Sequence, residues 1–255
     1  MKITKWFLLA ALALLCCACS KNDPLAYVDE DADWVVYGNS SPILEHRIWD
    51  SIKGEMKDMK DFKDFKKELK DNLGVDLDDC GGKFAVWSDI SDSEEGKIKC
   101  VIVFDEIMAD DVIDAMVKAH KKDSNDYRKC TVDEEEIDDH DAYILKKKYT
   151  YGDDDDDDKE RIELTVIKLD EKIIQIVGND KPKKAAKPSR DSKLAKQIDK
   201  DCVIGAAISG DALRKLAEAE ADQVDLPEIG DVVAMVFLKK NEIKLEATCD
   251  ISDID

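Results

Sequence analysis

The sequence predicts an α+β fold in which an antiparallel sheet carries amphipathic helices on one face. Short apolar runs rich in β-branched residues recur along the chain and are separated by polar turns, which is typical of strands joined by hairpins. Between these runs, apolar residues recur at spacings of three and four, which is typical of helices with one buried face. The chain has 255 residues and is 44% apolar, which suffices for one large domain or two small ones.

The first half of the predicted fold covers residues 33–180. It begins with a strand at Trp34–Tyr37 and continues with a helix opened by Ser41 and Pro42, because Ser caps a helix and Pro suits its first turn. The remaining elements are a helix over residues 57–73, hairpin strands over 83–90 and 97–104, a helix over 109–121, and a meander of four strands over 127–132, 142–149, 160–168 and 171–178.

The second half covers residues 191–255 and repeats part of the first. Residues 181–190, with two prolines and four lysines, predict a linker before it. Its elements are a helix near residues 192–198, a strand over 202–208, a helix over 211–221 and a hairpin of strands 231–238 and 242–249. The order strand, helix, hairpin therefore occurs twice, as a partial internal duplication. Since the second copy stops after its hairpin, we expect it to pack against the first.

The first 18 residues predict a secretory signal peptide. Lys2 and Lys5 supply the positive start, and an apolar run of ten residues follows at Trp6–Leu15. That run is too short to span a bilayer, which needs about 20 residues as helix. Ala18 then precedes Cys19, and this ending resembles the lipobox of bacterial lipoproteins. The resemblance implies cleavage before Cys19 and attachment of lipid to its thiol.

The lipid site sets the expected location of the chain. Residues 19–32 predict a tether between the lipid and the globular body, and cleavage before Cys17 is the alternative. Resemblance to lipoproteins implies a cell-envelope location, with the body outside the cytoplasm. Ser20 after the lipid site favours the outer membrane by the same resemblance. The expected membrane contact is therefore the lipid anchor, since acyl chains add about 0.8 kcal/mol per buried methylene.

The segment between tether and sheet carries a second resemblance. Asp31, Ala32 and Asp33 run directly into the strand that begins at Trp34. This start, together with two α+β halves, resembles a group of uncharacterised bacterial lipoproteins. The resemblance implies the fold and brings no known catalytic residue, so it assigns no activity.

The net charge limits the partners. The chain carries a formal charge of −21, which repels nucleic acid, so no nucleic-acid partner is expected. It also repels anionic headgroups, so lipid rather than basic residues must hold the membrane. A protein or an extracellular polymer remains as the expected partner.

Two acidic stretches, Asp133–Asp141 and Asp153–Asp158, are predicted to be turns at opposite ends of the strand over 142–149. Clustered carboxylates bind hard cations, so weak calcium association is the functional interpretation of the second run. Its spacing lacks the Gly and Glu of a calcium-binding loop, and a solvated turn is the simpler interpretation. No cofactor is therefore predicted. The weak metal candidates are Asp153, Asp154, Asp155, Asp156, Asp157 and Asp158.

Five cysteines follow the lipid site, and none are spaced as CxxC, which argues against a zinc ribbon or a redox motif. Most are predicted to be small hydrophobic residues buried in strands. One disulfide among them is the alternative, and the sequence does not assign its pair. They are Cys80, Cys100, Cys130, Cys202 and Cys249.

No catalytic residue is predicted, because the chain lacks GxSxG, a phosphate-binding glycine loop and a metal-binding histidine spacing. Two hypotheses of function remain. The favoured one is a non-enzymatic envelope protein that binds a partner or is structural, and the alternative is a hydrolase whose carboxylates meet only in the fold. An enzyme requires facing carboxylates of raised pKa in a cleft, whereas a binding protein requires an exposed apolar patch or open sheet edge.

Overall fold

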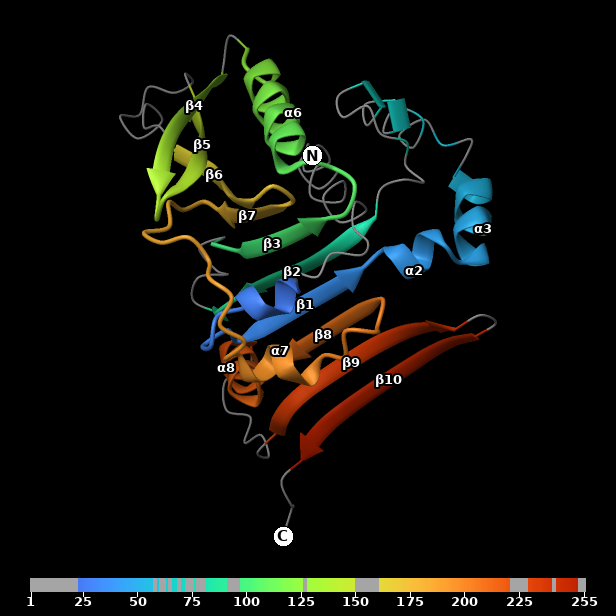
Figure 1. The fold of residues 1–255 in the computed structure, drawn as a ribbon. Helices are drawn as coiled ribbons and strands as arrows, with labels where there is room; N and C mark the ends of the chain where they lie inside the picture. The colour runs from blue at the N-terminus through green and yellow to red at the C-terminus, as the bar shows by residue number, and fades with distance from the viewer. Residues whose placement is uncertain are drawn as a thin grey trace.

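The computed structural model describes residues 23–56, 81–90, 97–125, 128–149, 161–220, 229–239 and 242–251, with seven isolated positions between residues 59 and 76. These residues form one antiparallel sheet of ten strands with helices packed on it, which confirms the α+β prediction. Figure 1 shows the sheet running as a twisted ribbon from β10 at one edge to β4 at the other.

The strands lie in the order β10-β9-β8-β1-β2-β3-β7-β6-β5-β4, and each pairs with its neighbours in antiparallel fashion. Their bounds are β1 Trp34–Asn39, β2 Gly82–Ser88, β3 Lys99–Phe104, β4 Arg128–Ile137, β5 His140–Tyr149, β6 Arg161–Asp170, β7 Ile173–Gly178, β8 Ile204–Ile208, β9 Ile229–Lys239 and β10 Glu242–Ile251. The helices are η1 Pro24–Tyr27, α2 Ser41–Leu44, α3 Arg47–Met56, α6 Ala109–Lys122, α7 Lys193–Gln197 and α8 Gly210–Glu220.

The predicted duplication is visible where β1 meets β8. Each of these strands begins a unit of strand, helical segment and hairpin, and the two first strands pair antiparallel with Val36 opposite Ala206. The units β1-β2-β3 and β8-β9-β10 therefore extend in opposite directions from this pair. A local two-fold axis between Val36 and Ala206 relates their strand order. The second unit thus joins the first through a continuous sheet, as the sequence predicts.

The first face of the sheet is covered by the longer helices. On α6, Val112, Ile113 and Met116 are buried against strand residues that include Ile102 and Leu145. Acidic residues occupy the first turn of α6 and basic residues the last, which suits the helix dipole. The helix α3 packs Trp49 into the same cluster.

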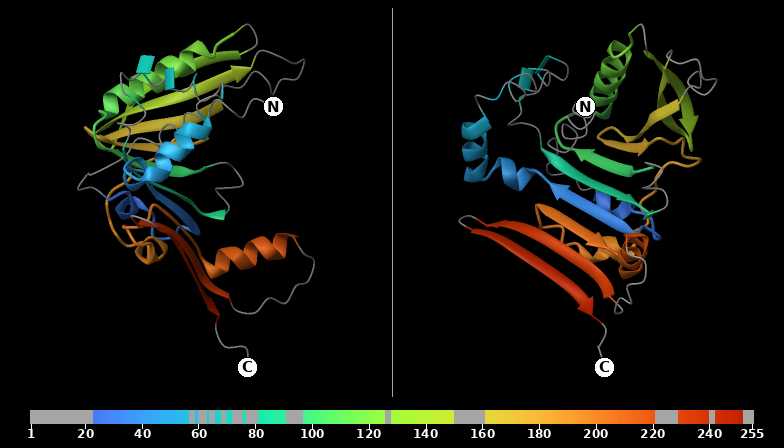
Figure 2. Two further views of the ribbon diagram at one scale, coloured as in Figure 1. Left: turned by 90° about the vertical axis from the view of Figure 1, so that its right-hand side faces the viewer. Right: turned by 180° about the vertical axis from the view of Figure 1, so that it is seen from behind.

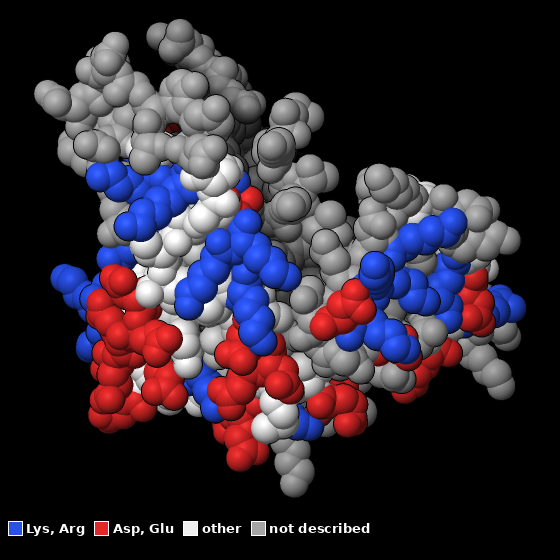
Figure 3. Space-filling model, turned by 90° about the horizontal axis from the view of Figure 1, so that it is seen from above, with Lys and Arg blue, Asp and Glu red and all other residues white. Residues whose placement is uncertain are grey.

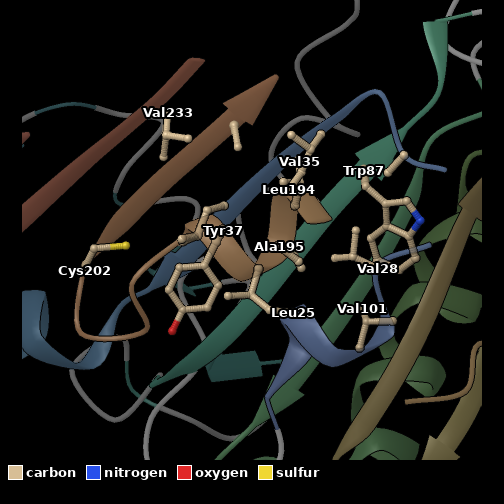
Figure 4. Close-up of a cluster of buried hydrophobic side chains, with 14 of the residues drawn as sticks. Leu25, Val28, Val35, Tyr37, Trp87, Val101, Leu194, Ala195, Cys202 and Val233 are labelled. Atoms are coloured by element: carbon tan, nitrogen blue, oxygen red, sulfur yellow. The ribbon is translucent and has the colours of Figure 1, made fainter. Parts of the chain in front are cut away.

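The opposite face is covered by shorter pieces. The helix η1 lies against β2 and β3 and contributes Leu25, and α7 lies beside η1 over β1 and β8 and contributes Leu194 (Figure 4). Tyr37 and Trp87 are fully buried there. The predicted tether over residues 19–32 is therefore too long, because Pro24–Val28 lie in the core. Apolar side chains of that segment bury more area in the core than a solvated tether would allow.

The acidic stretch Asp133–Asp141 is mostly strand, so its prediction as a turn is wrong. The strand β4 continues to Ile137 and β5 begins at His140. The turn itself consists of Asp138 and Asp139, with φ of 52° and 65°. Two residues of positive φ form the tight turn that matches the twist of a hairpin.

Tertiary contacts hold this acidic strand in place. Ile137 is buried together with Ala142 in a small apolar cluster at the end of the hairpin. Across the hairpin, Lys146 Nζ lies 2.5 Å from Asp133 Oδ2, and Lys181 pairs with Glu135. An apolar anchor and the ion pairs of Lys146 and Lys181 with these carboxylates thus offset the poor strand propensity of Asp and Glu.

Two further segments differ from prediction. The helix expected after Ser41 is divided into α2 and α3, and its cap position is Ser40. The predicted linker over 181–190 lies against the core, where the Ala186 N–H donates to Gln175 Oε1 at 2.8 Å. The body of the helix predicted over 57–73 lies outside the described residues, apart from isolated positions.

Candidate functional site

The second unit carries an exposed apolar sheet face. Alternation along β9 directs Val233 into the core that η1 and α7 cover, so its neighbours Val232 and Ala234 lie on the opposite face. The strand register then places apolar residues of β8, β9 and β10 side by side on that opposite face. We call this set the apolar face: Ile204, Ala206, Ile208, Val232, Ala234, Val236, Leu238, Ile243, Leu245, Ala247 and Cys249.

The apolar face is organised in rows across three strands. Ile204 lies opposite Val236, which lies opposite Leu245. The next row toward the other end of β10 consists of alanines, and Leu238 faces Ile243 at the hairpin end. No polar side chain interrupts the rows, so the apolar surface is continuous.

Several members of this face are open to solvent. Leu245 is 71% exposed, Ile243 59% and Ile204 48%. Exposed aliphatic residues scattered singly are ordinary, but these are neighbours on one sheet face. Contiguous exposed apolar surface of this kind is typical of a binding site.

The helix α8 borders the same face. Figure 2 shows α8 projecting from the sheet on the side opposite α7. Its buried residue Ala212 contributes to packing near the start of the helix, while Leu216 further along is 45% exposed. The Gly210 position is tight, because a Cβ there would lie 1.9 Å from the Ile229 carbonyl oxygen. Backbone contact therefore fixes the start of α8 beside β9 and leaves its later turn accessible.

A buried polar cluster lies beneath the C-terminal end of α6. His120 is fully buried, and its Nε2 lies 2.9 Å from the Lys146 carbonyl and 3.2 Å from the Thr131 carbonyl. Its Nδ1 lies 3.4 Å from Glu163 Oε2, and Lys147 pairs with the same carboxylate. Burial raises the pKa of Glu163, but contacts with His120 and Lys147 outweigh it, so the pKa lies below its ordinary value.

These contacts join the C-terminal end of α6 to the strands β4, β5 and β6. Arg128 donates to the Asp123 carbonyl and carboxylate at the end of the helix, the latter at 2.6 Å. Lys147 Nζ lies 3.7 Å from Asp123 Oδ2. Positive and negative groups alternate through the cluster, and the contacts with His120 and Lys147 favour the ionised form of Glu163.

Burial changes the pKa of a carboxyl group at the end of β3. Asp105, just after β3, has a pKa of about 6, mainly because of burial and then because of the neighbouring Glu106 carboxylate. Lys172 and Lys83 partly offset this shift. Glu106 is exposed, so Asp105 and Glu106 do not form a buried carboxylate pair. The exposed apolar patch expected of a binding protein is present on β8, β9 and β10.

The predicted site residues Cys19 and Asp153–Asp158 lie outside the described residues. Within the described ranges, no group of three or more His, Cys, Asp or Glu side chains is arranged to hold a metal ion. No helix in those ranges is both long and apolar enough to cross a membrane.

Four of the predicted cysteines are described, and no disulfide joins any two of them. Cys130 and Cys202 are buried, as expected for small hydrophobes, and burial raises the pKa of the Cys202 thiol to about 11. Cys249 instead lies exposed on the apolar face. Cys80 lies outside the described residues.

The charge is unevenly distributed over the surface. Figure 3 shows groups of basic side chains directly beside groups of acidic ones on one face of the molecule. The net charge of −21 therefore does not produce a uniform anionic surface on that face.

The apolar face combines residues from three strands. In the sequence, only its β10 part is indicated, by the alternation of apolar and polar residues after Glu242.

No protein-family model and no curated protein sequence matches the chain. Among solved structures, crystal form III of TP0453 from Treponema pallidum is similar, with a TM-score of 0.47, 14% identity, and coverage of 92% of this chain and 82% of that chain. Crystal form IV of TP0453 gives a TM-score of 0.45 and 12% identity, covering 89% of this chain and 80% of that chain. No residue role or function is carried over from these structures.

Proposed function

We propose that this chain is an exported lipoprotein that is held at a membrane by lipid on Cys19 and binds another protein through its apolar face. The observation that carries the binding role is the row of Ile204, Val236 and Leu245, which is continuous across three strands and exposed at both ends. Burying such a row contributes about 25 cal/mol for each Å² removed from water.

The chemistry of the face favours a protein over a sugar polymer. Its side chains are aliphatic and small, whereas sugar sites combine aromatic faces with polar groups. Trp49 and Trp87 are buried in the two cores, and Trp34 lies partly buried on β1, opposite Ile208 at the border of the apolar face. An apolar protein surface or amphipathic helix supplies the matching chemistry.

The lipid anchor rests on the signal sequence. We expect an alkyne-palmitate label to enter the full chain in its native host and to be lost in Cys19→Ala. The matched control is Cys17→Ala, which leaves Ala18 and Cys19 in place. Unchanged labelling of Cys19→Ala would contradict the proposed anchor site, and loss of labelling only in Cys17→Ala would move the anchor there.

The binding role is tested with a photo-crosslinking amino acid at Leu245 in intact cells. Position Thr248 is the matched control, because it lies on the same strand but on the opposite face. We expect adducts with another protein from position 245 and not from 248. Leu245→Asp should abolish binding of the captured protein without altering the far-ultraviolet circular dichroism, since the side chain is 71% exposed. Equal adduct yields from both positions would refute a role of the apolar face.

A further inference from the structure

The strand β10 ends the sheet, so one row of its backbone N–H and C=O groups faces outward. Its side chains alternate strictly between the apolar face and a polar face that carries Glu242, Lys244 and Glu246. Within the chain, Lys244 already pairs with Glu246. The polar face of this edge strand is therefore made of alternating charges rather than charges of one sign.

The other edge of the sheet has the opposite character. In β4 the residues Asp133–Glu136 are all acidic, so pairing of this edge with itself would bring carboxylates close to one another. Like charges directly opposite each other destabilise a strand pair. Charge of one sign thus protects β4 against pairing with itself, whereas the charges along β10 alternate in sign and can complement a second copy.

We propose that two copies of this chain pair antiparallel through β10, with Leu245 on the two-fold axis. In this register Lys244 of each copy lies opposite the partner's Glu246, and Ile243 lies opposite the partner's Ala247. Both pairs occur twice because of the symmetry. Every apolar residue faces an apolar one and every lysine faces a carboxylate.

Other registers are less favourable. A shift of one residue between the strands places apolar side chains opposite polar ones on each face. Centring the axis on Lys244 or on Glu246 places like charges opposite each other. Centring it on Ala247 requires pairing across the irregularity between Cys249 and Ile251. The Leu245 register uses only the regular part of β10.

The pairing extends the proposed function without replacing it. A two-fold axis perpendicular to the sheet keeps each face on its own side, so the two apolar faces join into one larger surface. The pairing uses the outward N–H and C=O groups of β10 in both copies, while Ile204 and Val236 remain accessible to another protein. Anchoring both copies to one membrane raises their effective concentration and favours the pair.

Disulfide crosslinking of the full chain in isolated membranes tests the register. In a Cys249→Ala background, Leu245→Cys should give a crosslinked homodimer under mild oxidation, because the two positions meet on the axis. Thr248→Cys is the matched control and should give none, since it lies opposite the partner's Glu242. The double variant Glu242→Cys with Thr248→Cys should crosslink again. A monomeric Leu245→Cys protein would overturn the proposal.

Charge exchange tests the same register independently. Lys244→Glu and Glu246→Lys should each lower the yield of the Leu245→Cys dimer by about fivefold or more, because each creates two like-charge pairs. The variant carrying both changes should restore the yield. Failure of the double variant to recover would also overturn the Leu245 register.

The outcomes separate this inference from the proposed function. Capture of another protein at Leu245 without any homodimer would leave the binding role intact and remove the pairing. A homodimer without capture of another protein would support the pairing through β10 and contradict the proposed binding role. Crosslinking of Leu245→Cys alone, followed by analytical ultracentrifugation of the detergent-solubilised chain, measures the pairing without any second protein.

Discussion

His120 Nδ1 on α6 lies 3.4 Å from Glu163 Oε2 on β6, so a fully buried imidazole and a strand carboxylate join the helix to the meander. Because Lys147 pairs with the same carboxylate, Glu163 is the shared partner of two groups. Its lowered pKa means that the charged form is favoured in the folded chain.

We expect Glu163→Gln to lower the free energy of unfolding by about 1–3 kcal/mol at pH 7, because it removes a charged acceptor from buried donors. Since the folded-state pKa of Glu163 is below the unfolded value, its contribution is present above the unfolded pKa and is lost as the pH falls through the folded pKa. Urea unfolding at pH 7 and in acid should therefore show the wild type and the variant converging in acid. Glu135→Gln is the control, since the exposed pair of Glu135 with Lys181 contributes well below 1 kcal/mol.

The opposite sign is expected at Asp105, whose pKa is raised to about 6. The folded state favours the protonated carboxyl, so stability is greatest below the unfolded pKa and decreases as the pH rises through about 6. Asp105→Asn should therefore raise stability at pH 7, and the gain should disappear in acid. Because Asp105 is only half-buried, solvent screens part of the effect, and we expect a gain of about 1 kcal/mol. A variant less stable than the wild type at pH 7 would contradict the assigned cause. Thermal melts across pH measure the effect.

Two glycines should respond in opposite ways to alanine. At Gly210 a Cβ would lie 1.9 Å from the Ile229 backbone oxygen, so Gly210→Ala should destabilise the chain by about 2–3 kcal/mol. At Gly54, inside α3, a Cβ meets nothing within 4 Å, so Gly54→Ala should stabilise by about 0.5–1 kcal/mol through helix propensity. Chemical denaturation of both variants checks the pair. Equal effects would show that the contact at Gly210 is not rigid.

The turn between β4 and β5 offers a stabilising change. Asp139 has φ of 65°, a conformation that is unfavourable for residues with a Cβ by about 1 kcal/mol. Asp139→Gly should therefore raise the melting temperature, because Gly is preferred at the second position of this turn. Asp139→Val, which tolerates the conformation worse, should lower it. Differential scanning calorimetry of the two variants gives the comparison.

The order of the helices and strands follows largely from local patterns. The helix at Ala109–Lys122 was predicted over 109–121, since its apolar spacing and terminal charges depend only on neighbouring residues. Alternation predicts the strands of the hairpin β9–β10 over 231–238 and 242–249, and the structure has them at Ile229–Lys239 and Glu242–Ile251. Elements whose pattern depends on long-range contacts were predicted less well.

The errors have a common physical origin. The acidic strand after Val132 contradicts local propensity, and distant groups stabilise it, among them Lys181 and the buried Ile137. Pro24–Tyr27 is flanked by polar residues in the sequence. Its apolar side chains nevertheless pack in the core against residues of distant strands. Neither interaction can be recognised from residues close in sequence.

By itself, the sequence determined the α+β class, the partial duplication and the order of most elements, because these depend on short-range periodicity and composition. Only the tertiary structure decided that β8 joins β1, that the faces of β8, β9 and β10 align into one exposed apolar surface, and that His120 and Glu163 meet. These features depend on strand register and on contacts between residues far apart in the chain, and register is set by the burial of whole sheet faces rather than by any local motif.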